Sequence, residues 1–445
     1  MKTAMMGSRR FGRFAVVLGA LSLGLLVTGC EDECVDSYDC TNKKGSAPEG
    51  KRYVCESNRC EVRDNTPPAG DAGTDAGTGT DAGTGSDAGT DAGTNPGTDA
   101  GTDAGVSCAD LPHDAKLGTL QLKTGFAAAE SVALPAGISQ VTALKSGTDF
   151  KLYGLRGSDK SLYELGTWPD IALGGAALKS VIADADRSER TYLSSFLAND
   201  GTRLLAGYTK DGPFTNIPGT VLVYDTASPD KSTYVSANGN YAAAGIAGYF
   251  FINGQGVEGV SAGGNAIYGL KTDTSPFQGA QVATFPEAGV FSSSVAVTSS
   301  DIAVFGYGKY DNAVKATTNF LRAVAPATYS PVLTGGSPLA LSDANAPQIY
   351  SGTDFFSAAG FGDGVALHRG VTDMTTYESF TRDVSRISLT TGGIDPKAVT
   401  VGDLKPVLTT DNNCTQVGIL TPLGADLLVG VSDKNGSRLV RIQKQ

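Results

Sequence analysis

The stretch Ser146–Leu165 (SGTDFKLYGLRGSDKSLYEL) decides the fold class of the C-terminal part of this chain. Two short runs rich in Leu and Tyr, Lys151–Leu155 and Ser161–Leu165, flank the polar turn Gly157–Lys160. Apolar runs of this length, bounded by Gly- and Asp-rich turns, are typical of antiparallel β-strands. The sequence therefore predicts a β-hairpin here, preceded by another tight turn at Ser146–Asp149.

Similar units recur along the rest of the chain. The pentapeptide Ser146–Phe150 is repeated as Ser351–Phe355. Turn residues with comparable surroundings follow one another at steps of about 50 residues, the last of about 70: Asp149, Asp200, Asn253, Asp301, Asp354 and Asp426. Further strand pairs are Asp200–Tyr208 with Thr220–Asp225, Tyr249–Asn253 with Asn265–Leu270, Asp301–Tyr307 with Asn319–Val324, and Ala425–Val431 with Ser437–Ile442.

Each unit has an apolar strand, a tight turn, a strand rich in small residues, a longer turn and a closing strand, which is the pattern of a β-propeller blade. Residues such as Gly154 and Gly306 suit strands that pack closely on a neighbouring blade or on the axis. We count six units, and the poorly patterned stretch Ala325–Tyr350 leaves room for more. We therefore expect an all-β domain at 107–445, a propeller of six to eight blades, with tandem β-sandwiches as the alternative.

The N-terminal residues 1–29 have the layout of a signal peptide. A basic segment precedes the uncharged stretch Phe14–Thr28, which is too short to span a bilayer comfortably. The basic residues are Lys2, Arg9, Arg10 and Arg13. An ordinary secretory signal or an uncleaved anchor would share this layout.

The tetrapeptide Val27-Thr28-Gly29-Cys30 resembles the lipobox of bacterial lipoproteins. The resemblance implies lipidation of the Cys30 sulfur, cleavage before Cys30, and anchoring in a lipid bilayer by two or three acyl chains. We expect the outer membrane or cell surface as the location. The inner membrane, facing the periplasm, is the alternative because the acidic residue Glu31 follows the cysteine.

The number of cysteines, seven, agrees with the lipidation of Cys30. Without Cys30, six remain for disulfides in an oxidising compartment: Cys34, Cys40, Cys55, Cys60, Cys108 and Cys414. The first four predict a small disulfide module at 30–65, for which we favour Cys34–Cys55 with Cys40–Cys60 while the other two pairings stay open. A zinc site is disfavoured by the spacing, and we expect no metal. The last pair predicts a latch that joins the two ends of the propeller.

Residues 66–106 are expected to be a disordered linker. From Asp71 to Gly105 the chain consists almost entirely of Asp-Ala-Gly-Thr units without a large apolar residue. Such a segment cannot bury enough surface to offset the entropy of ordering. Thirty-five residues of this kind would span roughly 30–35 Å and reach roughly 120 Å when stretched. Calcium binding and O-glycosylation of the threonines are the alternatives to a plain spacer.

Residues that could carry catalysis are sparse. The chain has two histidines, His113 near the predicted latch and His368 on a predicted strand. Ser261 lies in a Gly-x-Ser-x-Gly string, but a strand rather than a helix follows it. Asp184 and Asp186 begin a calcium-loop pattern that then fails. We expect an ordinary strand position for His368, a flexible glycine loop at Ser261, a solvated turn at Asp184 and Asp186, a core position for Trp168, no catalytic residues and no cofactor.

The formal charge is −11, and loss of the four basic signal residues would leave 31 basic against 46 acidic residues, or −15. An acidic protein repels nucleic acid, so nucleic acid is excluded as a partner. We expect a membrane-anchored surface lipoprotein whose propeller is a non-catalytic module for an unknown protein or polysaccharide. The alternatives are a carbohydrate-active hydrolase or lyase that uses carboxylates in the propeller funnel, and a structural subunit of an envelope complex.

Overall fold

The computed structural model describes residues 51–56, 59–64, 107–183, 192–210, 219–239, 242–260, 264–313, 316–372, 379–392 and 394–445. The chain divides into two units, Met1–Asp99 and Ala100–Gln445. In the first unit, β1 (Lys51–Glu56) and β2 (Arg59–Asp64) form an antiparallel hairpin in which Cys55 lies opposite Cys60. Cys60 is disulfide-bonded, and the side chain of its partner lies outside the described residues. The predicted signal peptide, Cys30, Cys34, Cys40 and the linker also lie outside them.

The second unit is built from six sheets, antiparallel except for one strand pair in the third, which we number as blades in chain order. Blade 1 contains β5 (Ile138–Ser146), β6 (Asp149–Arg156), β7 (Ser161–Thr167), β8 (Asp170–Ile171) and β9 (Lys179–Ser180). Blade 2 contains β10 (Tyr192–Asn199), β11 (Arg203–Lys210), β12 (Thr220–Asp225), β13 (Thr233–Asn238) and β16 (Gly256–Val257). Blade 3 contains β14 (Ala242–Ile246), β15 (Tyr249–Gly254), β17 (Ala266–Lys271), β18 (Gln278–Thr284) and β22 (Leu339–Ala340).

Blades 5 and 6 each include a strand from the beginning of the unit. Blade 4 contains β19 (Phe291–Val297), β20 (Ala303–Asp311), β21 (Ala316–Val324) and β23 (Gln348–Gly352). Blade 5 contains β24 (Phe355–Phe361), β25 (Gly364–Thr372), β26 (Ser379–Thr391), β27 (Val399–Thr409) and, as its outer strand, β3 (Gln121–Leu122). Blade 6 contains β28 (Gln416–Leu423), β29 (Asp426–Asp433), β30 (Gly436–Lys444) and, as its outer strand, β4 (Phe126–Ala133).

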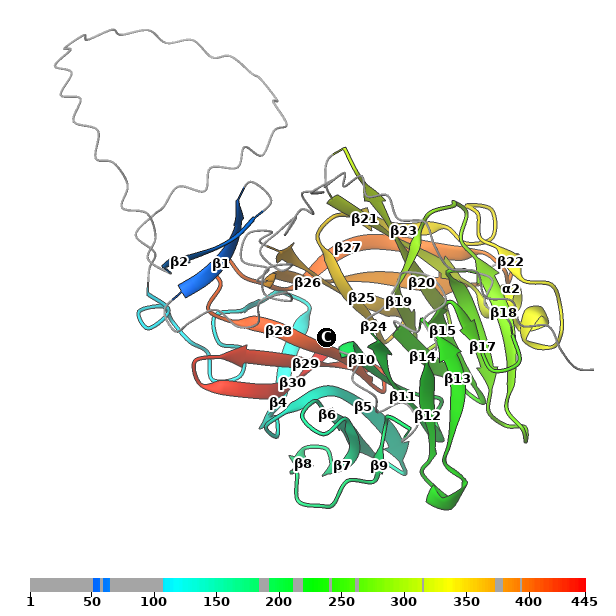
Figure 1. Ribbon diagram of the computed structural model, residues 1–445, viewed down its shortest axis with the longest axis horizontal. Coiled ribbons are helices and arrows are strands. Elements are labelled where there is room, and N and C mark those ends of the chain that lie inside the picture. Colours follow the sequence, from blue (N-terminus) through cyan, green and yellow to red (C-terminus); the bar gives the residue numbers. More distant parts are fainter. Residues whose placement is uncertain are drawn as a thin grey trace, which may run out of the picture. The chain divides into compact units, whose positions relative to one another are not determined.

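The first strand of each blade packs against the first strand of the next, and β28 of blade 6 returns to β5 of blade 1. The sheets therefore succeed one another around a closed ring, as Figure 1 shows. This confirms the expected β-propeller, fixes six blades among the described residues and rules out tandem sandwiches. The stretch Ala325–Tyr350 contributes no seventh blade. It forms α2 (Pro326–Leu333) and β22, which pairs parallel with β18 and widens blade 3.

The two copies of the repeated pentapeptide do not lie at the same position within their blades. Ser146–Phe150 forms the turn between β5 and β6 within blade 1, whereas Ser351–Phe355 joins β23 of blade 4 to β24 of blade 5. The turn of blade 5 that corresponds to Ser146–Phe150 is at Gly362–Asp363. The predicted turn residue Asn253 is likewise inside β15. A Ser-Gly-Thr-Asp turn specifies a local reversal of the chain and carries no information about where in a blade it occurs.

Apolar side chains fill the spaces between neighbouring blades. One buried cluster joins Leu155 and Leu162 of blade 1 to Leu204 and Leu222 of blade 2, all fully buried. Burial of a leucine side chain contributes about 1.5–3 kcal/mol, so these residues are a main source of stability for the contact between blades 1 and 2. Trp168 is 8% exposed and packs in the cluster between blades 6 and 1, which agrees with its predicted core position.

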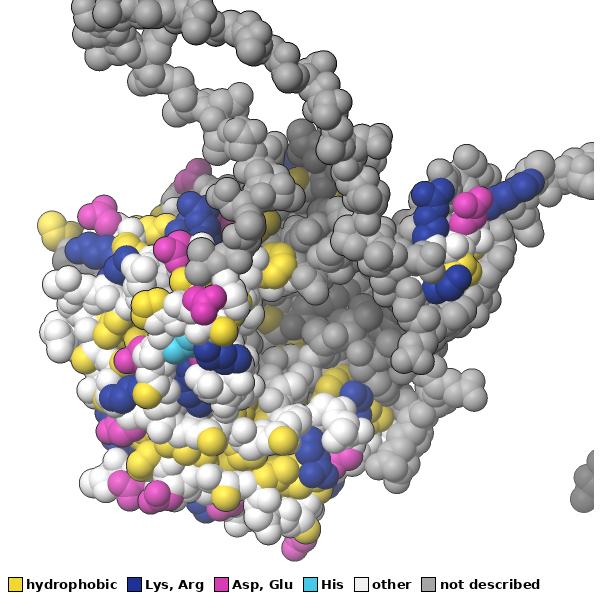
Figure 2. Space-filling model, turned by 90° about the vertical axis from the view of Figure 1, so that its left-hand side faces the viewer, with side chains coloured by type: hydrophobic (Ala, Val, Ile, Leu, Met, Phe, Trp, Pro, Cys, Tyr) yellow, Lys and Arg dark blue, Asp and Glu magenta, His cyan; other side chains and the backbone are white. Residues whose placement is uncertain are grey.

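The described surface mixes charges of both signs. On the face drawn in Figure 2, acidic and basic side chains are interspersed rather than gathered into one patch. Three of the exposed large apolar residues, Ile394, Val401 and Leu404, belong to the β26–β27 hairpin. The outer edge of β27 carries Asp403, Lys405 and Pro406, and its pairing with β26 is interrupted by irregularities. These are the features with which natural edge strands resist pairing with another chain.

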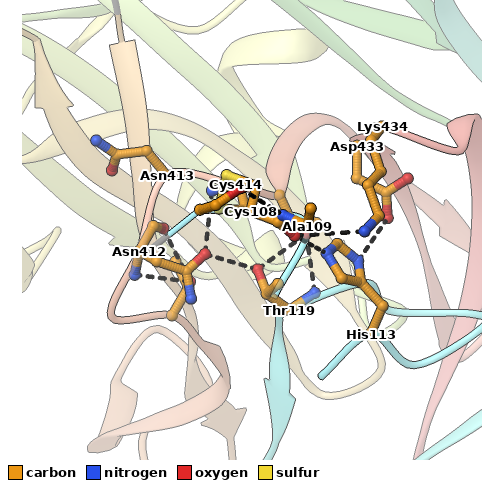
Figure 3. The surroundings of a disulfide bond; sticks show 12 residues. Cys108, Ala109, His113, Thr119, Asn412, Asn413, Cys414, Asp433 and Lys434 are labelled. Carbon is orange, nitrogen blue, oxygen red and sulfur yellow. Dashed lines mark hydrogen bonds and ion pairs between the residues drawn. A yellow bond between two sulfur atoms is a disulfide. The ribbon is translucent and has the colours of Figure 1, made fainter. Parts of the chain in front are cut away.

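The ring is closed by strand pairing and by a disulfide. The N-terminal strand β4 pairs with the C-terminal strand β30, and β3 pairs with β27. The predicted bond between Cys108 and Cys414 is present, with Cα atoms 5.4 Å apart. Figure 3 shows the backbone carbonyl of Cys108 accepting a hydrogen bond from His113 Nε2 at 2.9 Å, and the amide of Cys414 donating to Asn412 Oδ1 at 3.0 Å.

Candidate functional site

A cavity of about 320 Å³ lies on the axis of the propeller and is lined by residues of all six blades. Its walls are formed by β5, β10, β14, β19, β24 and β28, the innermost strand of each blade. The lining also includes Gly201, Ser299 and Gly424, which belong to turns that follow these strands. The cavity therefore opens at the end of the ring where the innermost strands finish.

Small side chains let the innermost strands approach one another closely around this cavity. Ala143, Ala198, Ala244 and Ala359 line it from four different blades. Glycine is required at two further positions. A Cβ atom on Gly245 would collide with the backbone carbonyl of Asn199, and a Cβ atom on Gly360 would collide with that of Val297. The width of the cavity is thus set by backbone contacts between blades.

We expect Gly360→Ala to lower the free energy of unfolding by about 2 kcal/mol, because the added methyl group meets a backbone carbonyl that cannot move without shifting blade 4. Gly418→Ala is the matched control. Gly418 also lies on an innermost strand, but an added Cβ would meet no atom within 4 Å. Chemical denaturation of the two variants measures the difference. Equal stability of both variants would show that the strands have room to separate.

The polar groups of the cavity wall are mostly fixed by hydrogen bonds. The Asn199 amide nitrogen donates to Thr142 Oγ1 at 2.8 Å, and Asn199 Oδ1 accepts the amide of Gly201 at 3.1 Å. Thr298 Oγ1 accepts the amide of Ile302 at 3.1 Å. Thr421 of β28 differs from them. It is 4% exposed, and its hydroxyl has no hydrogen-bond partner among the described residues. Because Thr421 lines the cavity, its hydroxyl is available to water or to a ligand there.

Two residues, Lys145 and Asp301, supply all the charge among the described lining residues. Lys145 is near the end of β5 in blade 1, and Asp301 is in the turn after β19 in blade 4. Neither side chain forms an ion pair or a hydrogen bond within the described part of the chain. In a ring of six blades, blades 1 and 4 face each other across the axis. The mouth of the cavity therefore presents a cation and an anion on opposite walls.

The turn that carries Asp301 is held firmly. Its amide donates to the carbonyl of Thr298 at 3.0 Å, and its own carbonyl accepts the Tyr329 hydroxyl of α2 at 2.7 Å. Asp301 adopts a φ of 60°, a conformation that Asp tolerates better than most residues. Although the residue as a whole is exposed, burial of its carboxyl group raises the pKa of Asp301. A nearby ammonium group would favour the charged form of this carboxyl.

A second hollow, of about 1100 Å³, lies between blades 2 and 3. Its three carboxylates already have partners. Asp225 is 3.3 Å from Arg203, Glu258 accepts the amide of Ser236 at 2.9 Å, and Asp273 is 3.7 Å from Lys271. These contacts hold neighbouring elements together, so we regard the axial cavity as the better candidate site.

The residues singled out in the sequence are not brought together. His113 lies beside the disulfide, whereas His368 is on β25 in blade 5. Ser261, Asp184 and Asp186 lie outside the described residues. Among the residues that are described, no group of three or more His, Cys, Asp or Glu could hold a metal ion. Sequence reasoning treated Asp301 only as a turn residue and passed over Lys145. Both residues lie at or just after the end of an innermost strand. They could have been found from the sequence if the innermost strand of each blade had been known.

His368 is buried in blade 5 as a neutral, hydrogen-bonded side chain. Its Nε2 is 3.1 Å from Thr381 Oγ1, which itself accepts the amide of Val417 at 2.8 Å. The Thr381 hydroxyl is therefore free to donate to Nε2 of an uncharged ring. The ring also packs edge-on against Phe356, with centroids 5.0 Å apart. Burial lowers the pKa of His368 to about 4.

We expect stability to fall as the pH drops from about 6.5 to about 4 because of His368. Over this range the unfolded chain binds a proton at the histidine that the folded chain does not, which costs about 3 kcal/mol in total. Above pH 6.5 the ring is neutral in both states, and the effect vanishes. Unfolding free energies of the wild type and His368→Gln, compared from pH 4 to 8, isolate this contribution. Parallel curves for the two proteins would contradict the prediction.

No protein family and no curated protein matches this sequence. Among solved structures, the chain is similar to the β-propeller domain of Cps50 (Swd1) from Myceliophteria thermophila, with 10% identity over 71% of this chain and 99% of that chain, at a TM-score of 0.37. It is also similar to extracellular domains 1–2 of Drosophila Semaphorin 1b, with 10% identity over 72% of this chain and 87% of that chain, at a TM-score of 0.34. At this level of similarity, neither structure informs the function of this chain. No helix among the described residues is long and apolar enough to cross a membrane.

Proposed function

We propose that this chain is a surface lipoprotein whose six-bladed propeller acts as a non-catalytic binding module. The observation that carries the proposal is the axial cavity, which presents Lys145 and Asp301 without partners of their own among the described residues. Both residues are exposed, so water solvates their charges until a ligand with complementary groups takes its place. Their position on a ring of rigid sheets suits recognition, because the groups are held in place before the ligand arrives.

The composition of the cavity wall favours binding over catalysis. Asp301 is the one carboxylate among its described lining residues, whereas glycosidases use a pair of carboxyl groups. The same lining contains no cysteine or histidine, so its serine and threonine hydroxyls have no neighbouring imidazole as a base. A site of this kind can hold a ligand but offers little to activate a nucleophile.

The proposed anchor is the acylated Cys30 at the start of the mature chain. In this proposal residues 1–29 are removed, 30–65 form the disulfide module, 66–106 form the linker, and 107–445 form the propeller. Two or three acyl chains give stable membrane attachment. The linker would let the propeller reach ligands roughly 30–35 Å from the anchor at its average extension.

Mass spectrometry of the N-terminal peptide tests the anchor, together with fractionation of cells that produce the wild type or Cys30→Ser. We expect the mature wild type to begin at an acylated Cys30 and to sediment with membranes, whereas the variant is released. A mature N-terminus elsewhere, or a membrane-bound Cys30→Ser protein, would overturn the lipoprotein assignment.

The binding function is tested separately, with the full-length Cys30→Ser chain applied to arrays of peptides and glycans. We expect a ligand that is retained and recovered chemically unchanged. Conversion of the ligand would establish an enzyme instead, and failure to retain any member of either array would count against a binding module.

A further inference from the structure

The arrangement of charge around the axial cavity limits what it can bind. Lys145 and Asp301 come from blades on opposite sides of the ring, and no described lining residue supplies another charge. A ligand with a single charge would pair with one wall and leave the charge on the other to water. A ligand with one positive and one negative group satisfies both walls, and its net charge is zero.

The space between the two charged groups has both apolar and polar surfaces. Phe150 and Pro422 line the cavity, and the ring of Phe150 lies over Gly424, where an added Cβ would be 2.8 Å from Phe150 Cζ. Thr421 contributes a hydroxyl that has no partner among the described residues. A short chain with a polar backbone could therefore lie across the mouth and donate or accept one hydrogen bond at Thr421.

The size of the cavity limits how much of a ligand can enter it. A volume of about 320 Å³ is close to the lower limit of pockets that hold small molecules, which is roughly 300 Å³. The part of a ligand that enters the cavity is therefore no larger than a short chain segment. The position of the two charges on opposite walls also disfavours a single α-amino acid, since its ammonium and carboxylate are attached to the same carbon.

We infer that the axial cavity binds a short zwitterionic peptide with both ends free, its ammonium at Asp301 and its carboxylate at Lys145. This inference rests on the proposed binding function and specifies the ligand class of the same site. The raised pKa of Asp301 supports it, because a bound ammonium would relieve the cost of holding that carboxylate partly buried.

Isothermal titration of the full-length Cys30→Ser chain tests the inference with glycine, diglycine and triglycine as probes. We expect diglycine or triglycine to bind and glycine to bind at least about tenfold more weakly. N-acetylation or C-terminal amidation of the peptide should each weaken binding by about tenfold or more, because each removes one charged contact. Capped peptides that bind as tightly as the free peptide would overturn the inference.

Two variants assign the ends of the peptide. Asp301→Asn should weaken the free peptide about tenfold while leaving the affinity of the N-acetylated peptide unchanged, and Lys145→Met should do the same with the C-terminal amide. Lys151→Met is the matched control for lysine, since Lys151 pairs with Glu164 at 3.1 Å and does not line the cavity. Asp273→Asn is the control for the hollow between blades 2 and 3. Neither control should change the affinity.

The outcomes separate this inference from the proposed function. Binding that is insensitive to Asp301→Asn and Lys145→Met, or lost in Asp273→Asn, would remove the axial cavity as the site. If no oligoglycine binds while the arrays retain another ligand, the zwitterion inference fails and the binding module stands. Thermal unfolding of each variant, measured alongside, ensures that a lost affinity reports the site and not a misfolded ring.

Discussion

Removing the Cys108–Cys414 disulfide is expected to lower the free energy of unfolding by about 5–6 kcal/mol, the largest effect that we predict. The two cysteines are 306 residues apart in the sequence. In the chain-entropy model, a bond that closes a loop of this length restricts the unfolded chain strongly. Without it, the ring is closed by packing of blade 6 on blade 1 and by the outer pairings of β3 and β4, of which β3 contributes just two residues.

Guanidinium denaturation of the wild type and the double variant Cys108→Ser/Cys414→Ser measures this effect as a lower midpoint. The slope with denaturant should also change, because the cross-link keeps the unfolded wild-type chain more compact. Repeating the measurement on the double variant with reductant provides the control. The denaturation midpoint of its propeller should not fall further, since the described part of that unit contains no other disulfide. A loss below about 1 kcal/mol would show that strand pairing alone closes the ring.

The second large effect is expected at a charge network where blade 4 leads into blade 5. Arg369 donates two hydrogen bonds to the carboxylate of Asp383, at 2.9 and 2.7 Å. Only 6% of the Asp383 side chain is exposed, and it also accepts the Ser385 hydroxyl at 2.7 Å. Asp354, in the connection between the blades, is 3.5 Å from Arg369 and 3.2 Å from Arg382. The network therefore ties the connection to β25 and β26.

We expect Arg369→Met to lower the free energy of unfolding by about 3–5 kcal/mol, because it leaves the carboxylate of Asp383 buried without its main partner. Chemical denaturation at pH 7 measures the loss. Lys309→Met is the matched control, since it breaks an ion pair with Glu287 in which both side chains are largely exposed. Such pairs contribute less than about 1 kcal/mol. Similar losses in both variants would mean that Asp383 finds water or another donor once Arg369 is gone.

The sequence alone allowed the strands and their turns to be predicted well. Runs such as Lys151–Leu155 and Ser161–Leu165 appear in the structure as parts of β6 and β7, and the predicted strand Tyr249–Asn253 is part of β15. Setting Cys30 aside left six cysteines, four of them clustered, and the remaining two predicted the Cys108–Cys414 bond. These features were accessible because strand alternation, turn chemistry and cysteine number are properties of local sequence or of composition.

The tertiary structure decided which strand is innermost in each blade, how many blades there are, and which residues line the axial cavity. Ser146–Phe150 and Ser351–Phe355 have the same sequence but occupy different places in their blades, because ring closure determines which strand becomes innermost. Lys145 and Asp301 are more than 150 residues apart and face one cavity only because blades 1 and 4 lie opposite each other. The sequence by itself determined an all-β repeat. Contacts between distant blades, which no local pattern encodes, decided which of its turns meet at the axis.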